Sequence, residues 1–293
     1  MRQVGDLLNS TDRKNALELA RNAGVAGFGS LALRALGPIL AVVISRALGA
    51  EIYGSYVLAV TVVGVGAAFS VLGLDQGVLR YIAYYNSQQD VPRAKGVLLS
   101  SVGIVLGVSA VASLALFWLS PMIATAVFRD AQVSVALKIL ALSLPISAVS
   151  LVLESSLQSL RAIDRHAAIN QIGRPLIELA LVGLALVVGF GFFGVLAARV
   201  LAVLVVACLN GLTLSRLLSF YRGVSPIYEI RELAGFSSPL FLDAVLLLVL
   251  GSIDVLVLGY FRDSSWVGIY KAVTLVVTPV VMPLLAFRSH KPG

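Results

Sequence analysis

Charged residues inside otherwise apolar stretches are the part of this sequence that could do chemistry. A charged side chain at the centre of a bilayer costs about 2.5–3.5 kcal/mol on insertion scales, so it is a functional candidate unless it can reach the surface. Four cations and three acids stand in such stretches: Arg34, Lys138, Arg199, Lys271, Glu178, Asp243 and Asp254. We predict that the cations contact an anionic ligand and that one of the aspartates binds a proton or a cation.

Arg34 lies deepest of the four cations, about twelve residues from either end of the apolar stretch 22–45. At that depth its side chain cannot easily extend to the membrane surface. Gly27, Ser30 and Gly37 share its helix face, because they recur at helical spacing. Such a small, polar stripe lets helices pack closely or lines a water-filled cavity, where an anionic headgroup would need a cation.

The two aspartates share a helix face. Asp243 and Asp254 are eleven residues apart, which at 3.6 residues per turn places them about 20° from eclipsed and three turns apart. They could equally serve as counter-ions for Arg34 or Lys271. Arg34 itself is therefore either a ligand contact or one partner of a buried ion pair with Asp243.

The remaining charges lie nearer the ends of their stretches. Lys138, Arg199 and Lys271 each stand close to one end, so each could face a ligand path or extend its charge to the headgroups. Glu178 follows Arg174 by one helical turn, which predicts a local ion pair between them.

The elements that carry these residues are membrane-spanning helices. The 293 residues are 59% hydrophobic and 13% charged, with a mean hydropathy of +0.96, too apolar for the surface of a soluble domain. About 20 apolar residues are needed to span the hydrocarbon core, and eight stretches qualify: 22–45, 55–74, 97–119, 134–153, 175–193, 194–214, 236–258 and 268–287. We predict an all-α multipass bundle in which the run GFGFFG, 189–194, forms a tight hairpin.

Basic residues give the predicted topology. Of the Lys and Arg residues outside the stretches, fifteen lie in the N-terminal segment and every second link, and three in the alternate links. Because cytoplasmic links retain positive charge, the N-terminus is predicted to be cytoplasmic. The net charge of +7 is then a topology signal, and no nucleic-acid partner is needed to explain it.

Metal, cofactor and enzyme chemistry find little support. One cysteine, Cys208, and two histidines, His166 and His290, are too few for a disulfide framework or for a cysteine or histidine metal site. We find no nucleophile triad, phosphate-binding loop or ATP signature. We therefore predict a protein that is not an enzyme and that uses no metal and no cofactor.

The chain repeats itself with a shift of 214 residues. This shift places Gly54 on Gly268 and Tyr56 on Tyr270, within the same order of long span, short link and second long span. A repeat of this kind implies two related halves with six spans each. The predicted parts are an N-terminal segment 1–21, a first half 22–214, a link 215–235, and the first two helices of a second half, 236–293.

Both ends of the chain carry a further expectation. Residues 4–20 fit a short interfacial helix or a solvated tail. A complete second half would need about as many residues as 22–214. We therefore expect a chain truncated after its eighth helix.

Three runs resemble a known family. RALGAEIYGSYVLAVTVVGVGAAFSVLGLDQGVLRYIAYY (46–85), LPISAVSLVLESSLQSLRAIDRHAAINQIGRPLIELAL (144–181) and DVLVLGYFRDSSWVGIYKAV (254–273) are similar to signatures of polysaccharide biosynthesis proteins. These are the O-antigen-type flippases of the multidrug, oligosaccharidyl-lipid and polysaccharide exporter superfamily. The resemblance implies a MATE-like six-helix first half followed by the first two helices of the second.

The resemblance also implies a function and a location. Family members move undecaprenyl-diphosphate-linked oligosaccharide across the bacterial inner membrane by alternating access, for surface polymers such as O-antigen, capsule or exopolysaccharide. The expected partners are this lipid-linked substrate and the polysaccharide polymerase and glycosyltransferases. Two alternatives stay open: a multidrug exporter of the same superfamily, and a non-transporting fragment or scaffold of a glycan assembly complex.

Overall fold

The structure of the chain is a computed structural model that describes residues 36–160, 162–218 and 223–289. The predicted interfacial segment, 4–20, and the candidate residue Arg34 lie outside these residues.

All regular structure in the described residues is helical, which confirms the predicted all-α class. The α-helices are α2 (Leu36–Leu48), α3 (Ala50–Val71), α4 (Leu74–Ser87), α5 (Val91–Met122), α6 (Ala131–Ala141), α7 (Leu144–Ser159), α8 (Ile163–His166), α9 (Arg174–Val187), α10 (Gly191–Leu217), α11 (Ile230–Phe261) and α12 (Ser264–Ser289). Two π-helical segments adjoin them: η1 (Ile123–Phe128) continues α5, and η2 (Ala167–Gly173) joins α8 to α9.

Four to six of the described helices can cross a membrane. The four single spans are Ala50–Val71, Val91–Phe128, Asp164–Val187 and Gly191–Leu217. Two bent pairs bring the number to six: α6 with α7, bent by 52°, and the two parts of α11, bent by 47°. They match the second to seventh of the eight predicted stretches. The first is described only in part, as α2, and the eighth falls on α12, whose later side chains lie outside the description.

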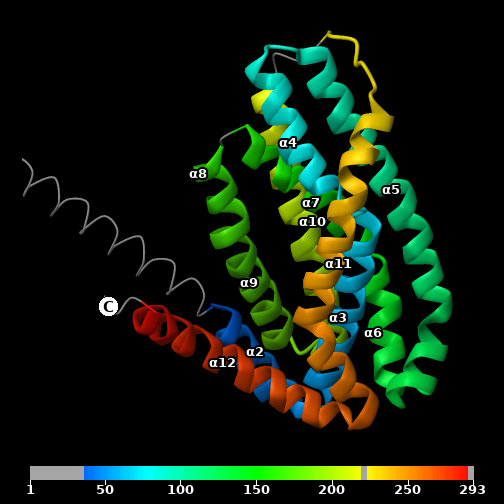
Figure 1. Ribbon diagram of the computed structural model, residues 1–293. Helices are drawn as coiled ribbons and strands as arrows, with labels where there is room; N and C mark the ends of the chain where they lie inside the picture. Colours follow the sequence, from blue (N-terminus) through cyan, green and yellow to red (C-terminus); the bar gives the residue numbers. More distant parts are fainter. Residues whose placement is uncertain (1–35, 161, 219–222, 290–293) are drawn as a thin grey trace, which may run out of the picture.

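The described links alternate between two ends of the bundle (Figure 1). Links 88–90 and 223–229 lie at one end of the bundle. We call it the basic end because the adjoining helix turns carry Arg93, Lys95, Arg216 and Arg231. Links 129–130, 188–190 and 262–263 lie at the opposite end. The alternation that the predicted topology requires is therefore present, and the cytoplasmic placement of the basic end stays a prediction.

One predicted link is in fact a helix. The chain from Leu74 to Ser87 forms α4, which continues α3 toward the basic end (Figure 1). Leu72 and Gly73 separate the two helices, because both adopt the left-handed region with φ of 54° and 71°. The prediction of a link was wrong because α4 carries too many polar residues to be recognised as a span.

Caps and glycines set other boundaries. Helix α5 begins at Val91, six residues before the predicted start of its span, because the side chain of Asp90 accepts a hydrogen bond from the backbone N–H of Arg93 at 3.2 Å. The predicted hairpin between α9 and α10 is confirmed. Gly189 and Gly191 have φ of 88° and 56°, a conformation that favours glycine.

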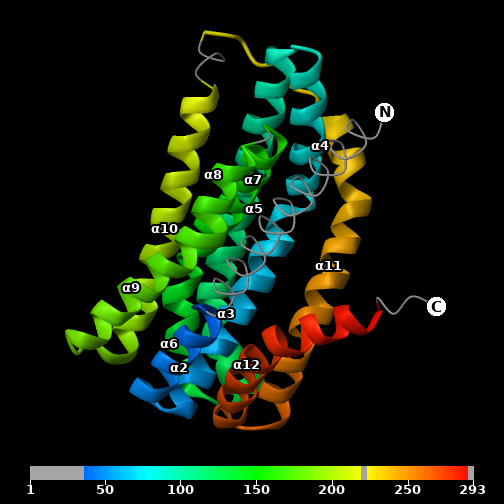
Figure 2. The same cartoon turned by 90° about the vertical axis from the view of Figure 1, so that its left-hand side faces the viewer.

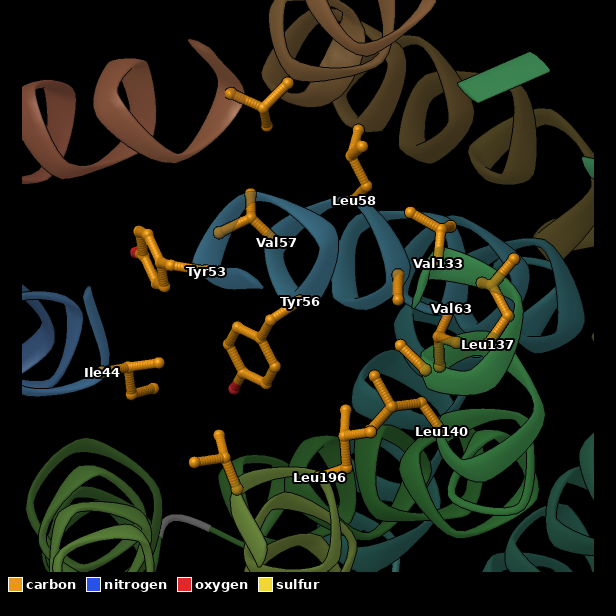
Figure 3. Close-up of a cluster of buried hydrophobic side chains, with 14 of the residues drawn as sticks. Ile44, Tyr53, Tyr56, Val57, Leu58, Val63, Val133, Leu137, Leu140 and Leu196 are labelled. Atoms are coloured by element: carbon orange, nitrogen blue, oxygen red, sulfur yellow. The ribbon is translucent and has the colours of Figure 1, made fainter. Parts of the chain in front are cut away.

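Helix α3 lies at the centre of the bundle and packs against α2, α5, α6, α7, α11 and α12. Figure 3 shows its side chain Tyr56 between Ile44 of α2 and Leu196 of α10, with Tyr53 above Ile44. On its other side, Val63 meets the buried residues of α6. The first half is thus packed around α3, which positions the polar groups described below.

The outer faces of several helices are apolar. Val111 and Trp118 on α5 are 68% and 79% exposed, Val187 on α9 is 87% exposed, and Leu250 on α11 is 71% exposed. In water, so much exposed apolar surface would drive aggregation, whereas lipid tails solvate it. The chain is a multipass membrane protein.

Helices α3 and α12 meet through two glycines that the 214-residue shift makes equivalent. A Cβ atom on Gly54 would lie 1.7 Å from the carbonyl oxygen of Ser264, and a Cβ atom on Gly268 would lie 2.1 Å from that of Ala50. Ala50 and Ser264 are themselves 214 residues apart, so the contact is reciprocal. A local two-fold relation between two equivalent helices produces this pattern. Beyond the contact, α12 runs obliquely away from the bundle beside α2 (Figures 1 and 2).

Candidate functional site

Arg199 is the predicted site residue with the clearest buried partners. Its Nη1 donates to a carboxylate oxygen of Glu178 on α9, and the hydroxyl of Tyr56 on α3 donates to the other oxygen at 3.3 Å. The Glu178 side chain is 8% exposed, so a buried carboxylate is neutralised by a cation from a neighbouring helix, as burial of a charge requires.

This arrangement corrects the predicted local pair. Arg174 does not pair with Glu178 but with Glu154 on α7, at 3.7 Å. Helix α9 packs against α10, which brings the Arg199 guanidinium across to Glu178. Sequence spacing can suggest only an ion-pair partner one turn away on the same helix. In the structure, the packing of α10 against α9 places the guanidinium of Arg199 nearer to Glu178.

A cavity of about 150 Å³ lies between the two ion pairs. Arg174 and Arg199 both line it, together with the serines of α7 and the turn before it. The rest of its wall is apolar and comes from α3, α6, α7 and α10. The cavity therefore joins two guanidinium groups to a short row of hydroxyls inside an apolar bundle.

A pair of amides extends this polar interior. Asn170 and Asn210 each donate to the other's side-chain oxygen, at 3.2 and 3.0 Å. Asn210 also donates to Ser150 at 3.4 Å, and Ser150 donates to Glu154 at 3.4 Å. Asn210 is fully buried, and these contacts satisfy its amide.

The predicted ion-coupling residues lie apart from this interior. Asp254, on α11, accepts a hydrogen bond from Tyr270 of α12 at 2.7 Å. It lines a groove of about 510 Å³ between the two helices, near Arg262 at the opposite end. Asp243 is exposed, on the other side of the bend in α11.

The other predicted cations are half-buried: Lys138 in the last turn of α6 and Lys271 near the start of α12. Among the described residues, no ion pair joins two of the predicted site residues. The described part of the chain therefore brings Arg199 to a carboxylate that sequence reasoning assigned elsewhere, and leaves Asp243, Asp254, Lys138 and Lys271 at separate places.

Asp130 is a polar contact that sequence reasoning missed. Its Oδ2 accepts hydrogen bonds from Ser55 of α3, at 2.5 Å, and from Ser264 of α12, while its Oδ1 accepts from the backbone N–H of Gln132 at 2.8 Å. Asp130 thus caps α6 and ties α3 to α12 beside Gly54. An acid before an apolar helix gave a capping signal, but nothing in the sequence indicated its serine partners.

A second polar cluster was also missed, at the basic end. Tyr85 of α4 donates to Glu229, and Arg93 of α5 donates to the same carboxylate at 2.8 Å. The hydrogen bond from Tyr85 and the charge of Arg93 lower the pKa of Glu229, while burial and that hydrogen bond raise the pKa of Tyr85. Glu229 precedes α11, so this cluster fixes the segment that leads into α11.

Comparison with known proteins now identifies the family. The model of a family described as polysaccharide biosynthesis protein matches residues 19–287, most of the chain. The chain belongs to the polysaccharide biosynthesis protein family. The predicted resemblance is therefore confirmed. No curated protein is significantly similar to the sequence.

A solved structure supports the fold of this polysaccharide biosynthesis protein. The chain is similar to a structure of the MATE multidrug transporter DinF-BH in complex with a ligand, with a TM-score of 0.60 and 17% sequence identity. The match covers 87% of this chain and 58% of that one, so the chain spans somewhat more than half of the transporter's length. The predicted MATE-like helical bundle is confirmed. Within the described residues, no three His, Cys, Asp or Glu side chains are grouped to hold a metal ion.

Proposed function

We propose that this polysaccharide biosynthesis protein moves a lipid-linked oligosaccharide across the bacterial inner membrane, by ion-coupled alternating access. The substrate class is an undecaprenyl-diphosphate-linked oligosaccharide, and the product serves a surface polysaccharide. The basic end faces the cytoplasm in this proposal, because positively charged links stay on that side during insertion. The polymerase and glycosyltransferases of the same polymer are the proposed partners.

The contact between α3 and α12 is the observation that carries this proposal. Gly54 and Gly268 hold the two helices together at the opposite end, and α12 then diverges from the bundle (Figure 1). Two related elements that touch at one end and separate toward the other have the geometry of a transporter closed on one side.

Charged residues of the spans have proposed roles in this cycle. Arg34, Lys138, Arg199 and Lys271 supply positive potential for the diphosphate, a group for which arginine is well suited. Asp254, bonded to Tyr270 between α11 and α12, and Asp243 are the proposed sites of the coupling ion.

Deletion of the gene tests the function. We expect loss of surface polysaccharide on a gel and accumulation of lipid-linked precursor on the cytoplasmic side. An unchanged polymer in the deletion strain would contradict the proposal. Altered drug susceptibility with normal polymer would instead indicate a multidrug exporter.

A pair of arginine variants tests the role of charge. Arg34→Ala should abolish complementation of the deletion without lowering the protein level. Arg46→Ala is the matched control, because Arg46 is exposed at the end of α2. Equal complementation by both variants would remove Arg34 from the substrate path.

A further inference from the structure

The cavity between α3, α6, α7, α9 and α10 has a balanced set of charges on or directly behind its wall. Arg199 is paired with Glu178 at one side, and Arg174 with Glu154 at another. Two guanidinium groups and two carboxylates leave the cavity with no net charge. The charges are therefore stable as they stand, but each cation is available only in competition with its carboxylate.

Both guanidinium groups have N–H donors that their carboxylate partners do not use. A guanidinium carries five N–H donors, and among the described residues the hydrogen bond that Arg199 makes goes to Glu178 through Nη1 alone. Arg174 is held more loosely, at 3.7 Å from Glu154, and its side chain is 37% exposed. Because both side chains line the cavity, the remaining donors are available to a ligand inside it.

The lining of the cavity favours an oxyanion. A cavity that just holds one water molecule measures about 10–15 Å³, so a cavity of about 150 Å³ has room for a phosphate or diphosphate group. Guanidinium groups bind phosphate oxygens through parallel, charge-assisted hydrogen bonds. Ser147 and Ser150 add hydroxyls to the same wall.

An anion entering a neutral, half-buried cavity brings uncompensated charge, which is costly unless a carboxylate is neutralised. Glu178 is the carboxylate that would be neutralised, because it forms the ion pair with Arg199. The titratable groups that face Glu178 in the described part of the chain are Tyr56 of α3 and Arg199 of α10, with Tyr53 beside Tyr56. Around Glu154 they are Arg174 and His166.

We propose that this cavity binds a phosphoryl group and that Glu178 takes up a proton when it does. The proton comes from a buffer acid or hydronium ion of the solvent, which is left as its conjugate base. The Arg199–Glu178 hydrogen bond breaks, and Arg199 bonds the phosphoryl oxygens instead. No other bond changes. The phosphoryl group belongs either to the diphosphate of the lipid-linked substrate, in which case the inference rests on the proposed function, or to a free phosphate.

Calorimetry on the purified full chain in lipid nanodiscs tests the proposal. The probes are geranylgeranyl diphosphate and inorganic diphosphate, titrated at pH 6.0 and 7.5 in two buffers of different ionisation enthalpy. The second pKa of the probe's phosphate groups is about 6, so affinity is expressed for the fully ionised probe. If one proton is bound with each anion, that affinity should rise by about tenfold for each pH unit of acidification, and the two buffers should report uptake of about one proton.

Substitutions around the cavity test which side chains bind the phosphoryl group and which takes up the proton. Glu178→Gln should bind at pH 7.5 about tenfold more tightly than the native chain, because its amide no longer holds Arg199 through a charge. Its affinity should keep only the pH dependence that comes from ionisation of the probe's own phosphate groups, whose second pKa is about 6. Tyr56→Phe removes one donor to Glu178 and should tighten binding by a smaller factor. Arg199→Gln should lose binding. Glu51→Gln, an exposed carboxylate at the start of α3, is the matched control and should behave as the native chain does.

The outcomes separate this inference from the proposed function. Proton-linked binding of inorganic diphosphate but not of the lipid would support the cavity and contradict the lipid substrate. Lipid binding that is independent of pH and of Arg199 would keep the substrate and overturn the cavity site. Native-like behaviour of Glu178→Gln, in a protein that elutes as a single species, would also overturn it.

Discussion

Substitution of Gly54 by alanine tests whether the contact between α3 and α12 closes the opposite end of the molecule. The new Cβ atom would lie 1.7 Å from the carbonyl oxygen of Ser264, whereas real contacts of Cβ atoms are not shorter than 3.0 Å. The two helices must therefore separate by at least about 1.3 Å, the difference between these distances. Overpacking of this kind costs about 1–3 kcal/mol, and each 1.4 kcal/mol changes an equilibrium about tenfold.

The substitution should destabilise the closed arrangement of α3 and α12. Alanine favours an isolated helix over glycine by about 1 kcal/mol, so any loss of closure comes from the contact itself. We expect the ratio of closed to open molecules to fall by about five- to 150-fold. Gly103→Ala in α5 is the control, because a Cβ atom there meets nothing within 4 Å.

Distance measurements between spin labels provide the assay. Labels at Glu51→Cys and Trp266→Cys report on the two helices, since both residues are exposed near the contact. Cys208, which is exposed, is first replaced by serine. Gly54→Ala should shift the distance distribution toward longer values and lower complementation. An unchanged distribution with full activity would refute the role of the contact in closure.

Three further substitutions probe the polar contacts. Asp130→Ala removes the cap of α6 and the acceptor of two serine hydroxyls. The free energy of unfolding should therefore fall by about 2 kcal/mol, which would be measured as a lower unfolding midpoint. An unchanged midpoint would contradict this expectation. Asn210→Leu leaves the amide of Asn170 without its partner, at a cost of about 1–3 kcal/mol, and the double leucine variant should recover part of it. The folded structure lowers the pKa of Glu229 below its ordinary value of 4.5. The ionised carboxylate should therefore stabilise the fold at pH values above 4.5, and this stabilisation should be lost as the pH falls through the lower pKa of the folded state. Protease cleavage of 223–229 should rise in that range, and Glu229→Gln should make cleavage independent of pH.

Much of the fold could be predicted from the sequence because membrane helices are encoded locally. Apolar length identified six spans, and the glycines at 189 and 191 identified the hairpin. The equivalence of Gly54 and Gly268 followed from the repeat, and the structure places the two glycines in contact. Helix α4 was missed because its amphipathic, tyrosine-rich sequence resembles a link when only apolar length is considered.

The candidate site was harder to predict, since its partners are far apart in sequence. Glu178 and Arg199 are joined across two helices, and Asp130 reaches serines on α3 and α12. Spacing along one helix suggested Arg174 as the partner of Glu178, but it cannot reveal which neighbouring helix brings a nearer guanidinium. Charges inside spans could be identified as important, whereas their pairing depended on packing.

The pairing of charges around the interior cavity has an electrical consequence. Moving one elementary charge through a membrane potential of 100 mV involves about 2.3 kcal/mol. Arg199 with Glu178, and Arg174 with Glu154, each form a neutral unit. A rearrangement of the empty first half that carries both pairs together therefore moves no net charge from this region across the field. Membrane voltage would neither drive nor oppose that step, and its rate in vesicles should stay the same when the potential is collapsed.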